Sequence, residues 1–159
     1  MKATQQQAPH GGMHAIFERI IVPIDGSPAS HAAAQTAIGL AETFGGRVRF
    51  VFVLDVEHLS GELTFWSGKP VPLALDAVRA SAAAALRDAT ASATSFEVPS
   101  ETIALEGDIV EQIMLEAAAW KADSIVIGTH SRRMSFSPAL GSKTAELLRH
   151  VTIPVLVVR

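Results

Sequence analysis

Short apolar runs alternate along the chain with longer segments whose apolar residues recur at helical spacing. The apolar runs are rich in β-branched residues, which favours strands, whereas several of the longer segments are rich in alanine. Glycine, serine, aspartate and proline separate the segments, as expected of turns and helix caps. The predicted strands cover residues 19–24, 47–54, 96–105, 124–127 and 152–159, and the predicted helices cover residues 29–44, 72–94, 109–121 and 142–150.

This alternation predicts the fold class. Strands separated by helices of about 10–20 residues indicate βαβ units, which build a mostly parallel sheet through right-handed crossovers. The sequence therefore predicts a single-domain α/β fold with a five-stranded parallel sheet and helices on both faces. We expect residues 1–15 to form a flexible extension ahead of a domain that spans residues 16–159.

Two candidate ligand-binding residues directly follow predicted strands. Asp25 follows the first strand and Gly128 follows the fourth. In open parallel sheets, ligands bind at the carboxyl ends of the strands, where the strand order reverses. The two residues meet in one crevice if the first and fourth strands are neighbours.

The segment 128–142 joins a glycine at the end of a strand to Gly141-Ser142 at the start of a helix. Glycine lets a backbone approach a ligand closely, and free N–H groups at a helix N-terminus attract phosphate. Alternatively, these residues are simply turn and cap residues. Arg132 and Arg133 can clamp phosphates bidentately or form a solvated loop face.

Composition and charge exclude several classes of protein. A chain that is 48% hydrophobic and 18% charged is not disordered, and its net charge of -3 favours neither a nucleic-acid partner nor an anionic membrane. Cysteine is absent, which excludes disulfides and thiol chemistry, and no apolar run approaches the roughly 18 residues that span a bilayer. The polar N-terminal region is no secretory signal, so we expect a cytoplasmic protein.

Five motifs follow one another along the chain. They are Ile-Ile-Val-Pro-Ile-Asp-Gly-Ser at 20–27, Gly107-Asp108, Asp-Ser-Ile-Val-Ile-Gly-Thr-His at 123–130, Gly141-Ser142 and Leu-Arg-His-Val-Thr-Ile-Pro-Val-Leu-Val-Val at 148–158. Together they resemble the universal stress protein family, in order over residues 17–159. The resemblance implies a homodimer and a parallel sheet of strand order 3-2-1-4-5, like that of adenine-nucleotide alpha-hydrolases.

The ATP-binding branch of that family carries a glycine, two residues, a second glycine, nine residues, and then glycine with Ser or Thr. Gly128 and Gly141-Ser142 match the first and last parts, whereas Ser131 replaces the second glycine. The resemblance implies ATP, with Mg²⁺, whose adenine amino group meets Asp25 and whose base lies near Val53. The implied ATP-binding residues are Pro23, Asp25, Val53, Gly128, Thr129, Ser131, Arg132, Gly141, Ser142 and Lys143.

The last apolar segment carries a physical argument about assembly. Pro154 cannot donate a ladder hydrogen bond, so it belongs on an edge strand or at the start of a strand. An exposed Val-Leu-Val-Val edge is a template for pairing, and pairing with a second copy covers it in a two-fold dimer. The resemblance implies the same homodimer, formed through Ile153, Val155, Leu156, Val157 and Val158.

The main hypothesis is an ATP-binding dimeric stress-response sensor or switch. Slow hydrolysis at most is expected, because phosphate attack needs a positioned base and only Arg132 and Arg133 are candidates to stabilise charge. The alternative is an interaction module that dimerises without nucleotide, suggested by Ser131. An adenylate-transferring enzyme is disfavoured, because neither a Ser-Gly-Gly loop nor a His-x-Gly-His signature is found.

Ser131→Gly tests the departure from the motif. If the backbone at residue 131 adopts a positive φ, serine costs roughly 1–2 kcal/mol there, and the glycine variant should bind ATP more tightly. Alternatively, the serine hydroxyl donates a hydrogen bond to a phosphate oxygen. Unchanged affinity in an ATP titration would show that the serine is accommodated.

Overall fold

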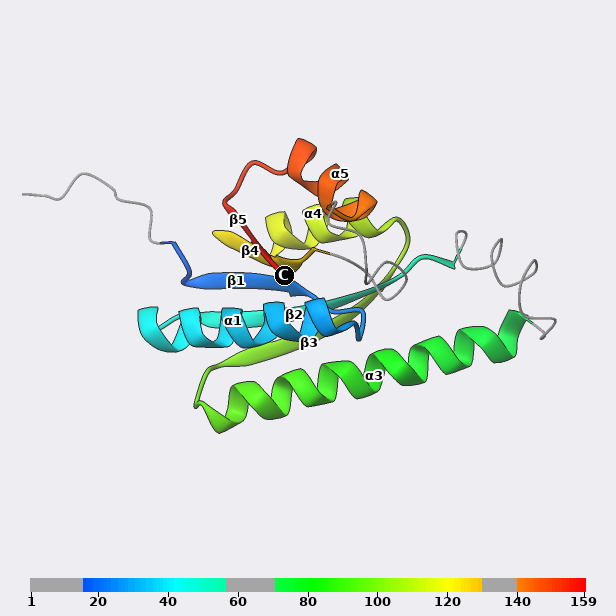
Figure 1. Ribbon diagram of the computed structural model, residues 1–159, viewed down its shortest axis with the longest axis horizontal. Coiled ribbons are helices and arrows are strands. Elements are labelled where there is room, and N and C mark those ends of the chain that lie inside the picture. The colour runs from blue at the N-terminus through cyan, green and yellow to red at the C-terminus, as the bar shows by residue number, and fades with distance from the viewer. Residues whose placement is uncertain (1–15, 57–70, 130–139) are drawn as a thin grey trace, which may run out of the picture.

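The computed structural model describes residues 16–56, 71–129 and 140–159, and it confirms the five-stranded parallel sheet of order β3-β2-β1-β4-β5 (Figure 1). The proposed N-terminal extension lies outside the described residues. The strands are β1 (Arg19–Pro23), β2 (Arg47–Leu54), β3 (Ser100–Glu106), β4 (Ser124–Gly128) and β5 (Val155–Val158). The helices are α1 (Pro28–Phe44), α3 (Val71–Ser95), α4 (Ile109–Ala119) and α5 (Ser142–His150).

Helices cover both faces of the sheet, as expected. Helices α1 and α3 lie on one face, and α4 and α5 lie on the other (Figure 1). Neighbouring residues of β1 therefore enter different cores: Ile20 packs with α1 and α3, and Ile21 packs with α4 and α5. Burial on both faces explains why the central strands are continuous apolar runs in the sequence.

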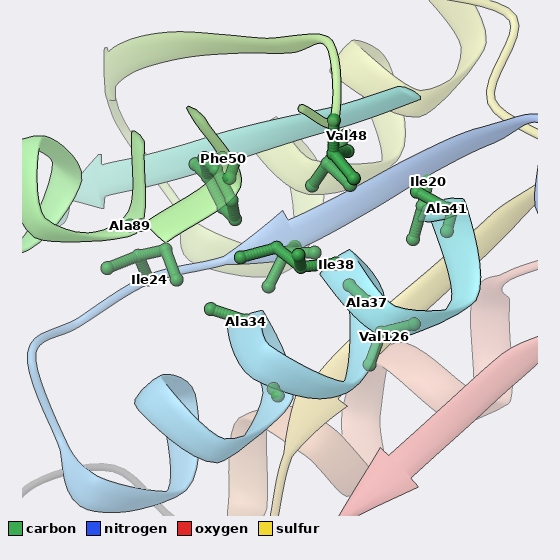
Figure 2. Close-up of a cluster of buried hydrophobic side chains, with 14 residues drawn as sticks. Ile20, Ile24, Ala34, Ala37, Ile38, Ala41, Val48, Phe50, Ala89 and Val126 are labelled. Atoms are coloured by element: carbon green, nitrogen blue, oxygen red, sulfur yellow. The ribbon is translucent and has the colours of Figure 1, made fainter. Parts of the chain in front are cut away.

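The core under α1 is built from small helical residues against larger strand residues. Ala34, Ala37 and Ala41 of α1 are buried beside Phe50 and Val126 (Figure 2). Alanine lets the helix approach the sheet closely. At the end of β4 this close approach leaves no room for a side chain at Gly128. Within the described residues, no helix has the length and apolarity that a membrane span needs.

The ends of α1 carry the serine, proline and glycine that are expected of helix caps. The Oγ of Ser27 accepts a hydrogen bond from the N–H of Ser30 at 3.0 Å, and Pro28 is the first helical residue. Gly45 ends the helix with a left-handed φ of 69°. Residue choice at both ends therefore fixes where α1 starts and stops.

Three predicted boundaries were wrong by two residues or more. Strand β5 begins at Val155 rather than at residue 152, and the other two differences lie at the ends of helices. The third strand begins at Ser100 rather than at residue 96, because α3 continues to Ser95 and Glu97 then reverses the chain with a φ of 55°. Helix α4 ends at Ala119 rather than at Lys121, which itself has a φ of 55°. Neither residue is a glycine, so the sequence carried no marker for these left-handed turns.

The amino end of the sheet is held by polar contacts. The carboxylate of Asp123 accepts hydrogen bonds from the N–H groups of Phe17, at 2.8 Å, and Arg19, at 2.7 Å. The guanidinium groups of Arg19 and Arg49 lie 4.8 and 4.6 Å from the ring centre of buried Trp120. These contacts join β1 and β2 to the end of α4.

Candidate functional site

The order of the strands brings the predicted site residues to one end of the sheet. Strand β1 lies between β2 and β4, with Ile20 opposite Ser124 and Ile21 opposite Ile125. The chain runs from β1 to β2 on one side and reaches β4 on the other, so the strand order reverses between β1 and β4. The condition set by the sequence, that the first and fourth strands are neighbours, is met.

The turn after β1 is tied down by Asp25. Its Oδ1 accepts a hydrogen bond from the N–H of Ser27 at 2.9 Å, and Gly26 between them has a φ of 76°. This is the turn-forming role that aspartate commonly plays. The bond uses one of the two carboxylate oxygens, so the turn also fixes the position of the other. Pro23 ends β1 just before this turn.

Val53 lies near the end of β2, on the face of the sheet that α4 and α5 cover. Its side chain is partly buried against the cluster that contains Val51 and Val110. An adenine ring beside Val53 would therefore lie on the α4 side of the sheet.

Gly128 has a structural role that the sequence did not reveal. It is the buried last residue of β4, and a Cβ at this position would lie 2.7 Å from the carbonyl carbon and 2.8 Å from the carbonyl oxygen of Ala29. Real Cβ atoms essentially never approach backbone so closely. The glycine lets the first turn of α1 pack on the end of β4, whereas contact of its backbone with a ligand stays a prediction.

The two ends of the 128–142 segment are held together. The N–H of Gly141 donates to the carbonyl of Thr129 at 2.8 Å, and the hydroxyl of Thr144 donates to the carbonyl of Gly128 at 3.1 Å. The N–H of Thr129 donates to the carbonyl of Val158 at 2.8 Å. The start of α5 is thus fixed beside the ends of β4 and β5.

The N-terminus of α5 differs from those of α1 and α4. Gly141 occupies the cap position, so the cap residue itself supplies no side-chain hydrogen bond, and the first turn contains no acidic residue. In α4, by contrast, Asp108 Oδ1 accepts hydrogen bonds from the N–H groups of Val110 and Glu111. Ser142 is therefore an exposed first helical residue and not the cap that its sequence position also allowed.

Lys143, in the first turn of α5, is paired with acidic residues. Its Nζ lies 2.8 Å from Oδ2 of Asp108 and 3.4 Å from Oε2 of Glu146. The hydrogen bond from Lys143, assisted by the backbone N–H of Glu111, holds the pKa of Asp108 below its usual range. The same hydrogen bond raises the pKa of Lys143. Sequence reasoning placed Asp108 at a helix start but did not connect it with Lys143.

Eight of the ten predicted ATP-binding residues lie in the part of the chain that the structure describes. Ser131 and Arg132 lie outside the described residues, as does Arg133. Among the described residues there is no group of three or more metal-ligating side chains. The residues found around the carboxyl ends of β1, β2 and β4 are Pro23, Asp25, Val53, Gly128, Thr129, Gly141, Ser142 and Lys143.

Comparisons with known proteins agree on one family. The model of the universal stress protein family matches residues 16–159. A universal stress protein of Methanocaldococcus jannaschii is 31% identical over 144 residues, which cover 91% of this chain and 83% of that protein. The solved structure of UspA from Lactobacillus plantarum superposes with a TM-score of 0.76 at 24% identity, covering 91% of this chain and 99% of the other.

Two further solved structures contain adenine nucleotides. A universal stress protein from Archaeoglobus fulgidus in complex with dAMP has a TM-score of 0.65 at 19% identity, with 91% of this chain and 100% of the other covered. A universal stress protein in complex with cAMP has a TM-score of 0.64 at 20% identity, with 91% and 98% covered. At these identities the likeness shows the shared fold.

Gly128→Ala should lower the free energy of unfolding by about 1–3 kcal/mol, because the new methyl group overlaps the backbone of Ala29. The measurement is chemical denaturation followed by circular dichroism. Gly39→Ala is the matched control, since a Cβ there meets nothing within 4 Å and alanine should stabilise helix α1 by about 0.5–1 kcal/mol. Equal effects of the two substitutions would contradict the packing role of Gly128.

Proposed function

The chain belongs to the universal stress protein family, and from that premise we propose that it is an ATP-binding homodimer that acts as a stress-response sensor or switch. The observation that carries the proposal is the N-terminus of α5, whose cap residue is a glycine without a side chain, beside the end of β4. Free N–H groups and the positive end of a helix dipole there favour a phosphate chain. The reversal of strand order between β1 and β4 puts this helix start where such folds take ligands.

The adenosine end of the ligand would lie toward β1 and β2. The carboxylate oxygen of Asp25 that does not hold the turn accepts a hydrogen bond from the adenine amino group, and Val53 packs near the base. Asp25 is fixed by its bond to the N–H of Ser27, so it would select adenine without a large ordering cost. The dAMP and cAMP complexes of related folds support this class of ligand.

The phosphates would lie at the start of α5. The N–H groups of its first turn and the hydroxyl of Ser142 donate to phosphate oxygens, and Lys143 supplies a positive charge. Mg²⁺ would accompany the phosphates and offset their charge, with oxygen ligands from the phosphates and water. Binding and recognition dominate in this arrangement, and any hydrolysis would be slow.

Strand β5 is an edge strand in the described sheet, which supports the proposed dimer. The carbonyls of Pro154 and Val158 accept hydrogen bonds from β4, so the backbone groups of Val155 and Val157 point to the open side. Leu156 between them is 39% exposed. Pro154 blocks only the side that faces β4, and the outer edge is left able to pair with a second copy.

ATP titration tests the nucleotide site. The wild-type protein should bind ATP in calorimetry, and Gly141→Val should abolish binding because its side chain fills the start of α5. The backbone at Gly141 has a φ of -59° and a ψ of 148°, which valine adopts readily, so the variant should fold and dimerise as before. Absence of ATP binding by the wild-type protein would favour the nucleotide-free interaction module, and an unaffected valine variant would move the site elsewhere.

Val157→Pro tests the dimer. Proline removes an N–H group that points to the open side of β5 and leaves the bonds of Pro154 and Val158 to β4 in place. Sedimentation equilibrium should show a dimer for the wild-type protein and a monomer for the variant. Val158→Ala, which keeps every backbone N–H, is the control and should remain dimeric. A dimeric proline variant would exclude pairing through this edge.

A further inference from the structure

Lys143 occupies an unfavourable position in α5. A positive charge in the first turn of a helix opposes the helix dipole, which favours acidic residues at that end. The first turn of α5 contains no acidic residue. The neighbouring helix follows the usual rule, with Asp108 as its cap and Glu111 in its first turn. The cation of α5 is tolerated because Asp108 and Glu146 lie beside it.

The pair between Lys143 and Asp108 is suited to exchange. The two side chains are 39% and 42% exposed, and ion pairs of such exposure contribute little to stability. The two oxygens of Asp108 have separate tasks: Oδ1 caps α4, and Oδ2 holds the ammonium group. Release of Lys143 would therefore leave the cap of α4 intact.

The charges around Lys143 work against an anionic ligand. Asp108 and Glu146 carry two negative charges against the one positive charge of the lysine. A phosphate group at the start of α5 would meet this negative surplus unless the ammonium group turned toward it. Asp108 thus competes directly with phosphate for the same cation.

Resting on the proposed nucleotide site, we propose that Asp108 is a specificity-determining residue that restrains Lys143 and sets how strongly the site prefers nucleotides with long phosphate chains. In the ligand-free protein the lysine is held by Asp108, and on binding of a di- or triphosphate it turns to the phosphates. A ligand without phosphate gains nothing from this exchange. The charge of Asp108 therefore affects affinity in proportion to the charge of the ligand.

Asp108→Asn separates the two tasks of the residue. The amide oxygen of asparagine still caps α4, whereas the negative charge that restrains Lys143 is lost. Affinity for ATP should rise about two- to fivefold, since the pair is half exposed, and affinity for adenosine should change by less than about twofold. Calorimetric titration of ATP, ADP, AMP and adenosine gives this dependence on chain length directly.

Three further variants complete the experiment. Glu111→Gln removes an equal charge from the same turn of α4, and it should alter ATP affinity less than Asp108→Asn does. Glu146→Gln, which weakens the second contact of Lys143, should change affinity in the same direction as Asp108→Asn. Adding Asp108→Asn to Lys143→Gln should raise ATP affinity less than Asp108→Asn does alone, because only the direct repulsion between Asp108 and phosphate is then relieved and no restrained cation is released.

Each outcome bears on a defined claim. The inference is overturned if the wild-type protein binds ATP but Asp108→Asn binds it no more tightly, if the gain is the same for adenosine, or if the gain is undiminished without Lys143. Binding of ATP by none of the variants overturns the proposed nucleotide site and the inference with it. Unchanged thermal unfolding of Asp108→Asn confirms that the cap is retained.

Discussion

The end of β4 lies against the first turn of α1 so closely that residue 128 has no room for a side chain. This contact sets the distance between the turn after β1, which leads into α1, and the loop that leaves β4. Asp25 and Thr129 are held on either side of the strand reversal as a consequence. Packing in the core therefore positions the described part of the candidate site. Residues that are already positioned lose little conformational entropy when a ligand binds.

The two ends of the sheet are built on different principles. At the amino end, Arg49 forms ion pairs with Glu101 and Glu116 beside Trp120. Burial alone would lower the pKa of Arg49, but its hydrogen bonds to the two glutamates raise it, so the charge is kept. At the carboxyl end, α5 begins at a glycine, which offers no side chain as a cap. Paired charges thus hold the fold together at the amino end, whereas the cap residue at the carboxyl end leaves backbone N–H groups without a side-chain acceptor of its own where a ligand is proposed to bind.

Sequence reasoning predicted the features that depend on local chemistry. The cap at Ser27, the left-handed Gly45 and the edge position of β5 follow from residue types and strand order. It failed where a non-glycine residue takes a left-handed φ, as Glu97 does before β3. It also missed the packing of Gly128 on Ala29, while the contact of this glycine with a ligand stays a prediction.

Contacts between distant segments set the limit of such prediction. The pairing of Asp108 with Lys143 joins the starts of two helices 35 residues apart, and no periodicity or motif carries that information. The sequence placed both residues correctly at helix starts. Only the packing of α4 beside α5 shows that one charge offsets the other.

The proposed nucleotide site and the proposed dimer edge share one strand pair. Thr129, at the site, donates a hydrogen bond to the last residue of β5, and β5 is bonded to β4 along its length. Because β4 and β5 are bonded to each other and packed against the core under α4 and α5, we expect little displacement of one strand against the other. The main effect of a bound nucleotide would then be a change in surface charge at the starts of α4 and α5, and the dimer edge would be displaced little. A partner that reads the nucleotide state would be expected to contact that charged surface.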